Sequence, residues 1–287
     1  MGLCVVLFFP TLAYLLLCTT PSAADILYPY GASYDTPTSK VDDGSTLITL
    51  STSIKLFGNV STLMHVNNNG LLSFSSGISA YTPTHLPVTD GNPFLAPFWA
   101  DVNNALAGDI FYRQSNNDTS LLSRAATDIR TYFGLQTFSA TWVFVATWSN
   151  VAFFGSSSSS TTVNTFQAVL ISNGSFTFVM FNYGNILWTT GRGSGGDIKG
   201  TGGKPALAGV NSGLNTGYYE IPTSLTADII NITSTTNVNV NGRWVIRVDK
   251  LHPRDVNGVI VVMEKHTWNK HTGGGLPALL CTLILGQ

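Results

Sequence analysis

The sequence predicts a mainly β fold with one helix (α+β), in which an amphipathic helix packs against an antiparallel sheet or sandwich. Three observations predict this class. Side chains alternate with period two over residues 137–148, two Asn-Gly pairs separate apolar runs, and one stretch after Asp118 has helical spacing.

The clearest strand covers residues 137–148. The face that carries Phe138 and Trp142 is apolar, and the face that carries Val143 and Val145 is largely apolar as well. A strand that is apolar on both faces is covered on both sides. We therefore expect this strand in the middle of the fold.

Asn-Gly pairs predict two hairpins. Asn173-Gly174 lies between the candidate strands 166–171 and 175–183, and Asn69-Gly70 lies between two further apolar runs. Asn-Gly is the strongest short hairpin signal because both residues tolerate positive φ. The other strand candidates are residues 46–50, 63–66, 71–74, 109–113, 207–210 and 243–248.

One amphipathic helix of about 13 residues interrupts the strands. Asp118-Thr119-Ser120 offers an N-cap, and Gly134 offers a stop. Between them the apolar residues recur at helical spacing: Leu121, Leu122, Ala125, Ala126, Ile129 and Tyr132. Residues 156–162 are predicted to be a low-complexity loop and residues 191–203 a flexible glycine-rich loop, both within the same domain.

Charge is scarce in this chain of 287 residues. Only 14 residues are Lys or Arg and 15 are Asp or Glu, so 10% of the chain is charged and the net charge is −1. An average soluble domain has about 25%. Without a basic field to gather phosphates, nucleic acid is excluded as an expected partner.

The N-terminus predicts a secretory signal peptide over residues 1–24. Residues 5–18 are almost wholly apolar, and small residues Ser22 and Ala24 stand at the −3 and −1 positions of a cleavage site. A mature chain from Asp25 would have no transmembrane segment and would be secreted to the extracellular space or matrix. It would keep only Cys281, so its core cannot depend on internal disulfides.

Four Asn-x-Ser/Thr sequons predict N-glycosylation in a secreted chain. The acceptor residues are Asn59, Asn117, Asn173 and Asn231. Asn173 coincides with a predicted hairpin tip, which is an exposed position. We expect glycans to supply part of the surface hydration that charge does not.

The residues after the predicted domain, which spans 25–249, form an atypical C-terminal tail over 250–287. Its Gly273-Gly274-Gly275 run and apolar end leave open a lipid anchor or a truncated C-terminus. The tail also contains three histidines that leave metal binding open: His252, His266 and His271.

Asp101 and Asp109 are the candidate metal ligands. They flank a stretch with oxygen-bearing side chains, but Ala105 and Leu106 occupy places where an EF-hand loop needs an oxygen ligand and a glycine. A calcium site of another type remains open, as does a hydrolase that uses the two aspartates. The chain has no Gly-x-Ser-x-Gly or His-Glu-x-x-His motif, and the expected class is not an enzyme, with no other cofactor.

Ten motifs follow one another in a fixed order along the chain. They are Leu27-Tyr-Pro-Tyr-Gly, Val66-Asn-Asn-Asn-Gly-Leu-Leu-Ser-Phe, Ala96-Pro-Phe-Trp-Ala-Asp-Val, Gly108-Asp-Ile-Phe-Tyr-Arg, Ala140-Thr-Trp-Val-Phe-Val-Ala-Thr-Trp, Asn164-Thr-Phe-Gln-Ala-Val-Leu, Phe181-Asn-Tyr, Ile186-Leu-Trp-Thr-Thr-Gly, Ala208-Gly-Val-Asn and Gly242-Arg-Trp-Val-Ile-Arg-Val-Asp. This series resembles the NIDO family, the extracellular domain of nidogens, and most of all its alpha-tectorin-type members. The resemblance covers about residues 27–249.

The resemblance implies a non-catalytic extracellular-matrix module for cell–matrix adhesion, whose partners are matrix or cell-surface proteins. A lectin-like glycan-binding module, assisted by calcium at Asp101 and Asp109, is the alternative. Most of the large aromatic residues are expected in the core, because they are too apolar to leave in water as a group. These are Phe98, Trp99, Trp142, Trp148, Trp188 and Trp244.

Overall fold

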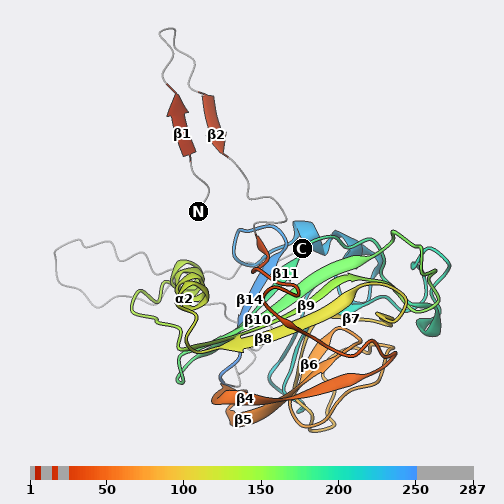
Figure 1. Ribbon diagram of the computed structural model, residues 1–287, viewed down its shortest axis with the longest axis horizontal. Helices are drawn as coiled ribbons and strands as arrows, with labels where there is room; N and C mark the ends of the chain where they lie inside the picture. The colour runs from red at the N-terminus through yellow and green to blue at the C-terminus, as the bar shows by residue number, and fades with distance from the viewer. Residues whose placement is uncertain (1–3, 8–14, 19–25, 251–287) are drawn as a thin grey trace, which may run out of the picture.

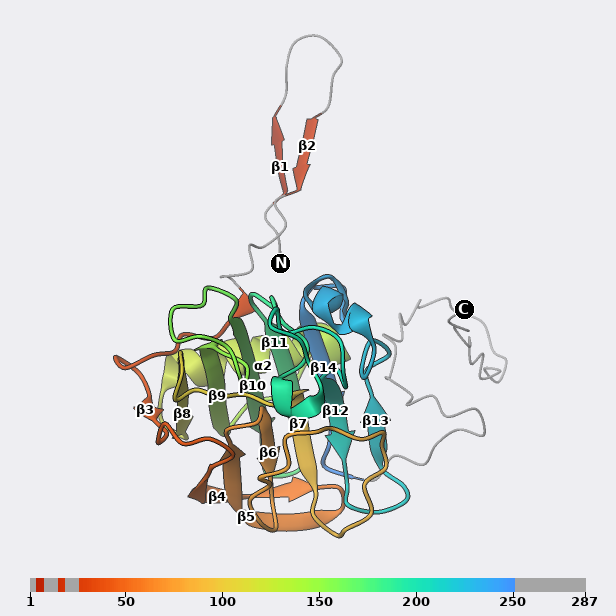
Figure 2. The same ribbon diagram turned by 90° about the vertical axis from the view of Figure 1, so that its right-hand side faces the viewer.

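The computed structural model describes residues 4–7, 15–18 and 26–250. Residues 26–250 form a sandwich of two six-stranded antiparallel sheets, with one α-helix on its outside (Figure 1 and Figure 2). This is the predicted fold class. Strands β1 (Cys4–Leu7) and β2 (Leu15–Cys18) pair with each other in a separate two-stranded sheet.

Sheet I has the strand order β14-β11-β10-β9-β8-β3. Its strands are β3 (Thr36–Pro37), β8 (Asp109–Ser115), β9 (Trp142–Val151), β10 (Asn164–Ser172), β11 (Thr177–Tyr183) and β14 (Arg243–Arg247). Sheet II has the order β13-β12-β7-β6-β5-β4. Its strands are β4 (Ser45–Leu56), β5 (Asn59–Asn67), β6 (Leu71–Ser73), β7 (Phe94–Trp99), β12 (Leu207–Asn211) and β13 (Tyr218–Glu220).

Strand β9 lies inside sheet I, between β10 and β8, and its residues 142–148 are buried on both faces, as predicted. It begins at Trp142 and not at Thr137. Residues 137–141 instead lead into the strand through a turn, in which the Phe138 amide donates to the Leu135 carbonyl over 2.9 Å. Phe138 still packs in the core, edge-on to Phe178.

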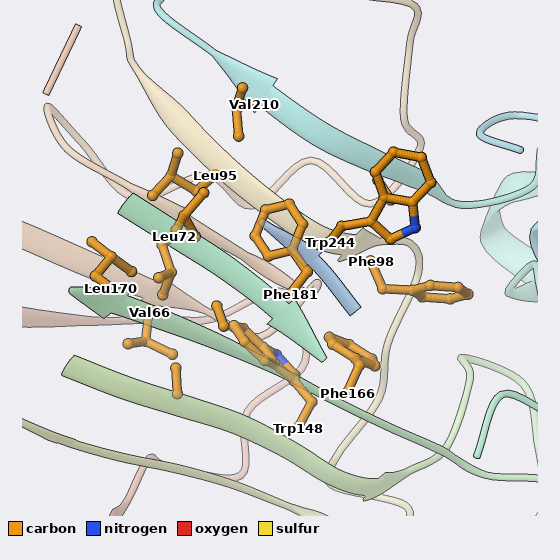
Figure 3. Close-up of a cluster of buried hydrophobic side chains, with 14 of the residues drawn as sticks. Val66, Leu72, Leu95, Phe98, Trp148, Phe166, Leu170, Phe181, Val210 and Trp244 are labelled. Carbon is orange, nitrogen blue, oxygen red and sulfur yellow. The ribbon is translucent and has the colours of Figure 1, made fainter. Parts of the chain in front are cut away.

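The main core fills the space between the two sheets (Figure 3). Trp148 and Phe166 of sheet I stack with their ring centroids 5.1 Å apart, and Phe98 of sheet II packs within 5.3 Å of Phe166. All six aromatic residues expected in the core are buried. Burial of side chains of this size is the main stabilising contribution to a fold without disulfides in its core.

Helix α2 (Thr119–Phe133) covers the face of sheet I that points away from sheet II (Figure 1). The Asp118 side chain caps its first turn by accepting from the Leu121 amide, and Gly134 ends it with φ of 67°. Its buried side chains are Leu121, Ala125, Ala126 and Ile129. The helix, its caps and its buried face are as predicted.

Both predicted hairpins are present, but their turns differ from the expected two-residue form. Asn67 pairs with Leu71 across a three-residue loop, and Ser172 pairs with Thr177 across a four-residue loop. In each loop only the glycine has positive φ, 83° at Gly70 and 84° at Gly174. The longer loops remove the need for positive φ at the asparagine.

The sequence did not predict β7 as a strand, although it lies inside sheet II. Its apolar residues are buried on both faces and contain Pro97, so period-two alternation is absent. Residues 75–93 cover the outer side of this part of sheet II. A small hydrophobic cluster there, separate from the main core, includes Leu86, Phe94 and Trp99. The outer face of β4 and β5 carries exposed Leu47 and Leu63.

Candidate functional site

The strand register separates two ends of the sandwich, which lie left and right in Figure 1. At the hairpin end, one row of paired residues crosses sheet I: Ser115, Val143, Ile171, Phe178 and Arg247. At the loop end lie Asp109 paired with Ser149, and Asn164 paired with Val151. The candidate metal ligands both belong to the loop end.

Asp101 lies just beyond β7, beneath the glycine-rich loop 191–203. Its Oδ2 atom accepts a hydrogen bond of 2.8 Å from the Gly193 amide, and its side chain is buried. Gly191 approaches so closely that an added Cβ atom would lie 2.4 Å from the Asp101 Cβ. The loop's glycines therefore allow its backbone to close over a buried carboxylate.

Burial raises the pKa of Asp101 to about 6, because the ionised carboxylate loses its contact with water. The hydrogen bond from Gly193 opposes this rise, and the nearby carboxylates of Asp43 and Asp42 add to it. Asp101 forms no ion pair with another described residue. The electrostatic neighbours of Asp101 are thus other acidic groups.

Asp109 is placed differently, at the first position of β8. Its carboxylate is 43% exposed and lies 3.0 Å from the Lys40 ammonium. Asp101 and Asp109 therefore occupy the same end of the molecule with separate partners. Residues 4–7, 15–18 and 26–250 contain no group of three or more His, Cys, Asp or Glu placed to hold a metal ion. Calcium binding at these aspartates stays a prediction.

The glycine-rich loop, which was predicted to be a flexible connection, makes specific contacts with the rest of the sandwich. It contains the short 3₁₀ helix η1 (Arg192–Ser194). Besides Asp101, it is held by the Arg192 amide, which donates to the Phe154 carbonyl over 2.9 Å. Gly200 also packs against Phe153 and Trp188, where an added Cβ would lie 2.8 Å and 2.6 Å from their side-chain atoms. Composition alone does not reveal these contacts.

All four sequon asparagines lie at the surface. Asn59 opens β5 and Asn117 precedes α2, and both are exposed. Asn173, in the β10–β11 turn, is half-buried. Asn231 is exposed in the 3₁₀ helix η2 (Ala227–Ser234). N-glycosylation at these four positions stays a prediction.

Histidine residues of the sandwich do not converge on the two aspartates. His65 lies in β5, and burial lowers its pKa. The Nδ1 atom of His85 lies 3.1 Å from Glu220 Oε1 at the other side of sheet II. The tail histidines His252, His266 and His271, Cys281 and the predicted cleavage site after Ala24 lie outside the described residues.

Comparison with known proteins identifies the family to which this domain belongs. The family model described as "Nidogen-like domain" (NIDO) matches residues 61–250. The chain belongs to the nidogen-like domain family. It is 51% identical to alpha-tectorin of Mus musculus over 237 residues, and 50% identical to alpha-tectorin of Homo sapiens over the same length. It is also 30% identical to nidogen of Drosophila melanogaster over 217 residues.

The match covers most of this chain and little of each relative. It spans 82% of this chain and 11% of either mammalian alpha-tectorin, and 73% of this chain and 15% of the Drosophila nidogen. No solved structure matches the chain significantly. The predicted resemblance to the alpha-tectorin type of nidogen-like domain is confirmed, and so is the extracellular location that it implies.

Within the described residues of this nidogen-like domain, no helix is both long and apolar enough to cross a membrane. Sequence reasoning found the buried Asp101 but missed what surrounds it. The glycine-rich loop brings exposed Arg192 and Ile198 to the end of the sandwich where Asp101 lies. The signal that was available is the density of glycine around Arg192, which indicates close backbone approach.

Proposed function

We propose that this chain is a non-catalytic extracellular-matrix module that acts in cell–matrix adhesion through protein–protein contacts. Its partners would be matrix or cell-surface proteins. The observation that carries the proposal is its similarity to alpha-tectorin, 51% identical over 82% of this chain. The more distant likeness to nidogen of Drosophila melanogaster supports the same class of module.

The placement of the acidic groups supports a binding role over catalysis. Glycoside hydrolysis needs two carboxyl groups that face one substrate bond. Asp101 is closed beneath Gly193, whereas Asp109 faces the Lys40 ammonium. Both would have to leave their present partners to act on a shared substrate.

Calcium-assisted glycan binding is the second candidate. It is favoured by the buried Asp101 carboxylate, whose only nearby charges named above belong to Asp42 and Asp43. A divalent cation prefers carboxylate oxygens and would relieve their repulsion. At such a site Asp43, and not Asp109, would be the second ligand beside Asp101, because the Asp43 carboxylate already acts on Asp101 and Asp109 is paired with Lys40.

Binding of the secreted full chain to a cell-free matrix tests the proposal. Epithelial cells deposit the matrix and are then removed, and the purified glycoprotein is titrated onto it with calcium or with EGTA. Saturable binding that survives EGTA and is lost after protease treatment of the matrix is expected. Binding to a glycan array that EGTA abolishes would favour the lectin instead. Turnover of a glycoside or an ester, lost in Asp101→Ala, would contradict both binding functions.

A further inference from the structure

The loop end carries a group of apolar side chains that the core does not use. Gly200 packs on Phe153 and Trp188, whose rings lie 5.8 Å apart. Phe154 and Leu187, which follow Phe153 and precede Trp188 in the chain, are 39% and 48% exposed, and Ile198, two residues before Gly200, is 79% exposed. Exposed apolar residues gathered around one contact indicate an interaction site more strongly than scattered ones do.

The same loop carries an excess of positive charge in a chain whose net charge is −1. Residues 191–204 contain Arg192, Lys199 and Lys204 but only one acid, Asp197. Arg192 and Lys199 are exposed, and neither Arg192 nor Lys204 forms an ion pair with a described residue.

Asp197 is occupied inside the loop. It accepts hydrogen bonds from the Thr201 amide and hydroxyl, both 2.9 Å, and these bonds lower its pKa. It accepts a further bond of 2.9 Å from the Lys199 amide. The Asp197 carboxylate therefore bonds within the loop, and Arg192 and Lys204 form no ion pair with it.

The loop is attached to the rest of the domain by hydrogen bonds at several points. Asp101 holds the Gly193 amide, and the Ser194 hydroxyl lies 2.8 Å from the Thr82 hydroxyl. The Thr189 and Thr190 amides both donate to the Gly200 carbonyl, over 2.7 Å and 3.0 Å. A loop that is already ordered loses less conformational entropy on binding.

Three of the four sequons lie at the opposite, hairpin end. Asn117 follows the end of β8, and Asn173 lies in the β10–β11 turn of the same end. Asn59 joins them because the Phe57 and Gly58 amides donate to the carbonyls of Val248 and Asp249, over 2.6 Å and 3.0 Å. Asn231, in η2, lies along the chain between β13 and β14, which are edge strands of the two sheets.

We propose that the loop end is the docking surface of this domain, and that it binds an acidic protein segment with apolar side chains. This inference rests on the proposed function, because it names the surface and partner chemistry of the same adhesive module. Arg192, Lys199 and Lys204 contact the acidic groups, and Phe154, Leu187 and Ile198 contact the apolar ones. The predicted glycans at Asn59, Asn117 and Asn173 keep the hairpin end free of such contacts.

A protein partner fits this surface better than a sulfated glycan does. Three cations are few for a polyanion, whose binding depends on many simultaneous charge contacts. A side chain as exposed as Ile198 gains nothing from a sulfate, whereas burial against another apolar group stabilises a protein complex. Interfaces between proteins combine such apolar centres with charged rims.

A new glycan placed on the loop tests the docking surface. Lys199→Asn converts Lys199-Gly200-Thr201 into a sequon, and Lys199→Gln is its control because it removes the same charge without an acceptor site. Both variants are secreted as full chains, and glycan occupancy and thermal melting are measured. Affinity for the cell-free matrix is expected to fall by about tenfold or more in Lys199→Asn, and by only about threefold in Lys199→Gln.

Substitutions without a glycan test the partner's chemistry. Arg192→Glu and Ile198→Ser are each expected to weaken matrix binding by about fivefold to tenfold. Lys55→Glu, which reverses an exposed cation on β4, is the matched control and should bind like the wild type. Added salt should weaken the wild type more than Arg192→Glu.

The outcomes separate the two proposals. If the wild type binds and the loop variants bind equally well, the docking surface is wrong and the proposed function stands. If enzymatic removal of sulfated glycans from the matrix abolishes binding while its proteins remain, the partner is a glycan and the assignment to a protein is overturned. If the wild type does not bind the matrix at all, both proposals fail together.

Discussion

The two Asn-Gly turns share a dipeptide and lie at opposite ends of the sandwich, yet they do different things. Gly70, at the loop end, is buried so tightly that an added Cβ would lie 2.0 Å from the Phe98 carbonyl oxygen. Gly174, at the hairpin end, has nothing within 4 Å of the same added atom. Their φ angles, 83° and 84°, are almost equal.

The difference lies in what surrounds each backbone. At the loop end, the Asn69 and Gly70 carbonyls accept from the amides of Ala100 and Phe98, so the turn joins β5–β6 to β7. At the hairpin end, the turn residues hydrogen-bond to one another, as Asn173 does to Phe176, and to Ser172 at the end of β10. The Asn69-Gly70 turn is therefore part of the core, whereas the Asn173-Gly174 turn lies at the surface. The difference can be measured as the stability lost on substitution.

Substitution of the two glycines by alanine is expected to give the largest effect. Gly70→Ala should destabilise the fold by about 3 kcal/mol or more, since it combines positive φ with a clash against the backbone. Gly174→Ala should cost about 1 kcal/mol, because only the left-handed conformation opposes it. Urea denaturation of both secreted variants measures the difference. Equal losses would show that the Gly70 turn can move away from Phe98.

The pH dependence of stability tests the buried group at the loop end. The pKa of Asp101 is raised to about 6, above its unfolded value of 3.8, so ionisation opposes folding. In EDTA, the contribution of Asp101 should become more favourable as pH falls from 7.5 to 4, on the order of 2 to 3 kcal/mol. The signal is the unfolding free energy of the wild type minus that of Asp101→Asn, which keeps an oxygen acceptor for Gly193.

This difference in unfolding free energy should rise toward low pH. A difference that stays constant with pH would mean that the Asp101 carboxyl is in contact with water in the folded protein. Calcium adds a second comparison at pH 7.5. A stabilisation by calcium in the wild type that is absent in Asp101→Asn would assign a metal to this carboxylate. Calcium that leaves both proteins unchanged would remove the basis of the lectin alternative at Asp101.

The asparagines of the two turns should differ less than their glycines. Asn69 is fully buried, donates to Asp43 over 2.7 Å and accepts from the Val102 amide over 3.0 Å. Asn69→Ala should cost about 2 kcal/mol, because the Val102 amide is left buried without an acceptor. Asn173→Ala should cost about 0.5–1 kcal/mol, since water can reach the Ser175 and Phe176 amides that it accepts from. Comparable costs in urea denaturation would contradict the contrast.

The elements that sequence predicted best are those whose signal is local. The α2 caps at Asp118 and Gly134, the two-sided apolar strand β9 and both Asn-Gly hairpins depend on neighbouring residues, and the structure contains them all. Strand β7 and the fold of the glycine-rich loop depend on contacts across the sandwich. No local pattern predicts that Gly191 will meet Asp101, ninety residues earlier in the chain.

The candidate site shows the same limit. Sequence selected Asp101 and Asp109 because they flank one stretch with oxygen-bearing side chains, and it predicted nothing of the loop end where the structure places them. It could not foresee that Lys40 would neutralise one while Asp42 and Asp43 crowd the other. These partners all lie in residues 40–43. The segment is attached to the turn at Asn69, whose side-chain amide donates a hydrogen bond to Asp43.

The smallest expected effect concerns the hairpin end alone. Asn173→Asp removes the predicted glycan but keeps the side-chain oxygen that accepts from the Ser175 and Phe176 amides. Its unfolding free energy should stay within about 0.5 kcal/mol of the wild type, because the turn is exposed and its bonds survive. Mass spectrometry should show one glycan fewer if the wild type is occupied there. Matrix affinity should also be unchanged, because the glycan lies opposite the loop end. A loss of matrix binding in Asn173→Asp, with stability intact, would reverse the comparison by making the hairpin end the adhesive one.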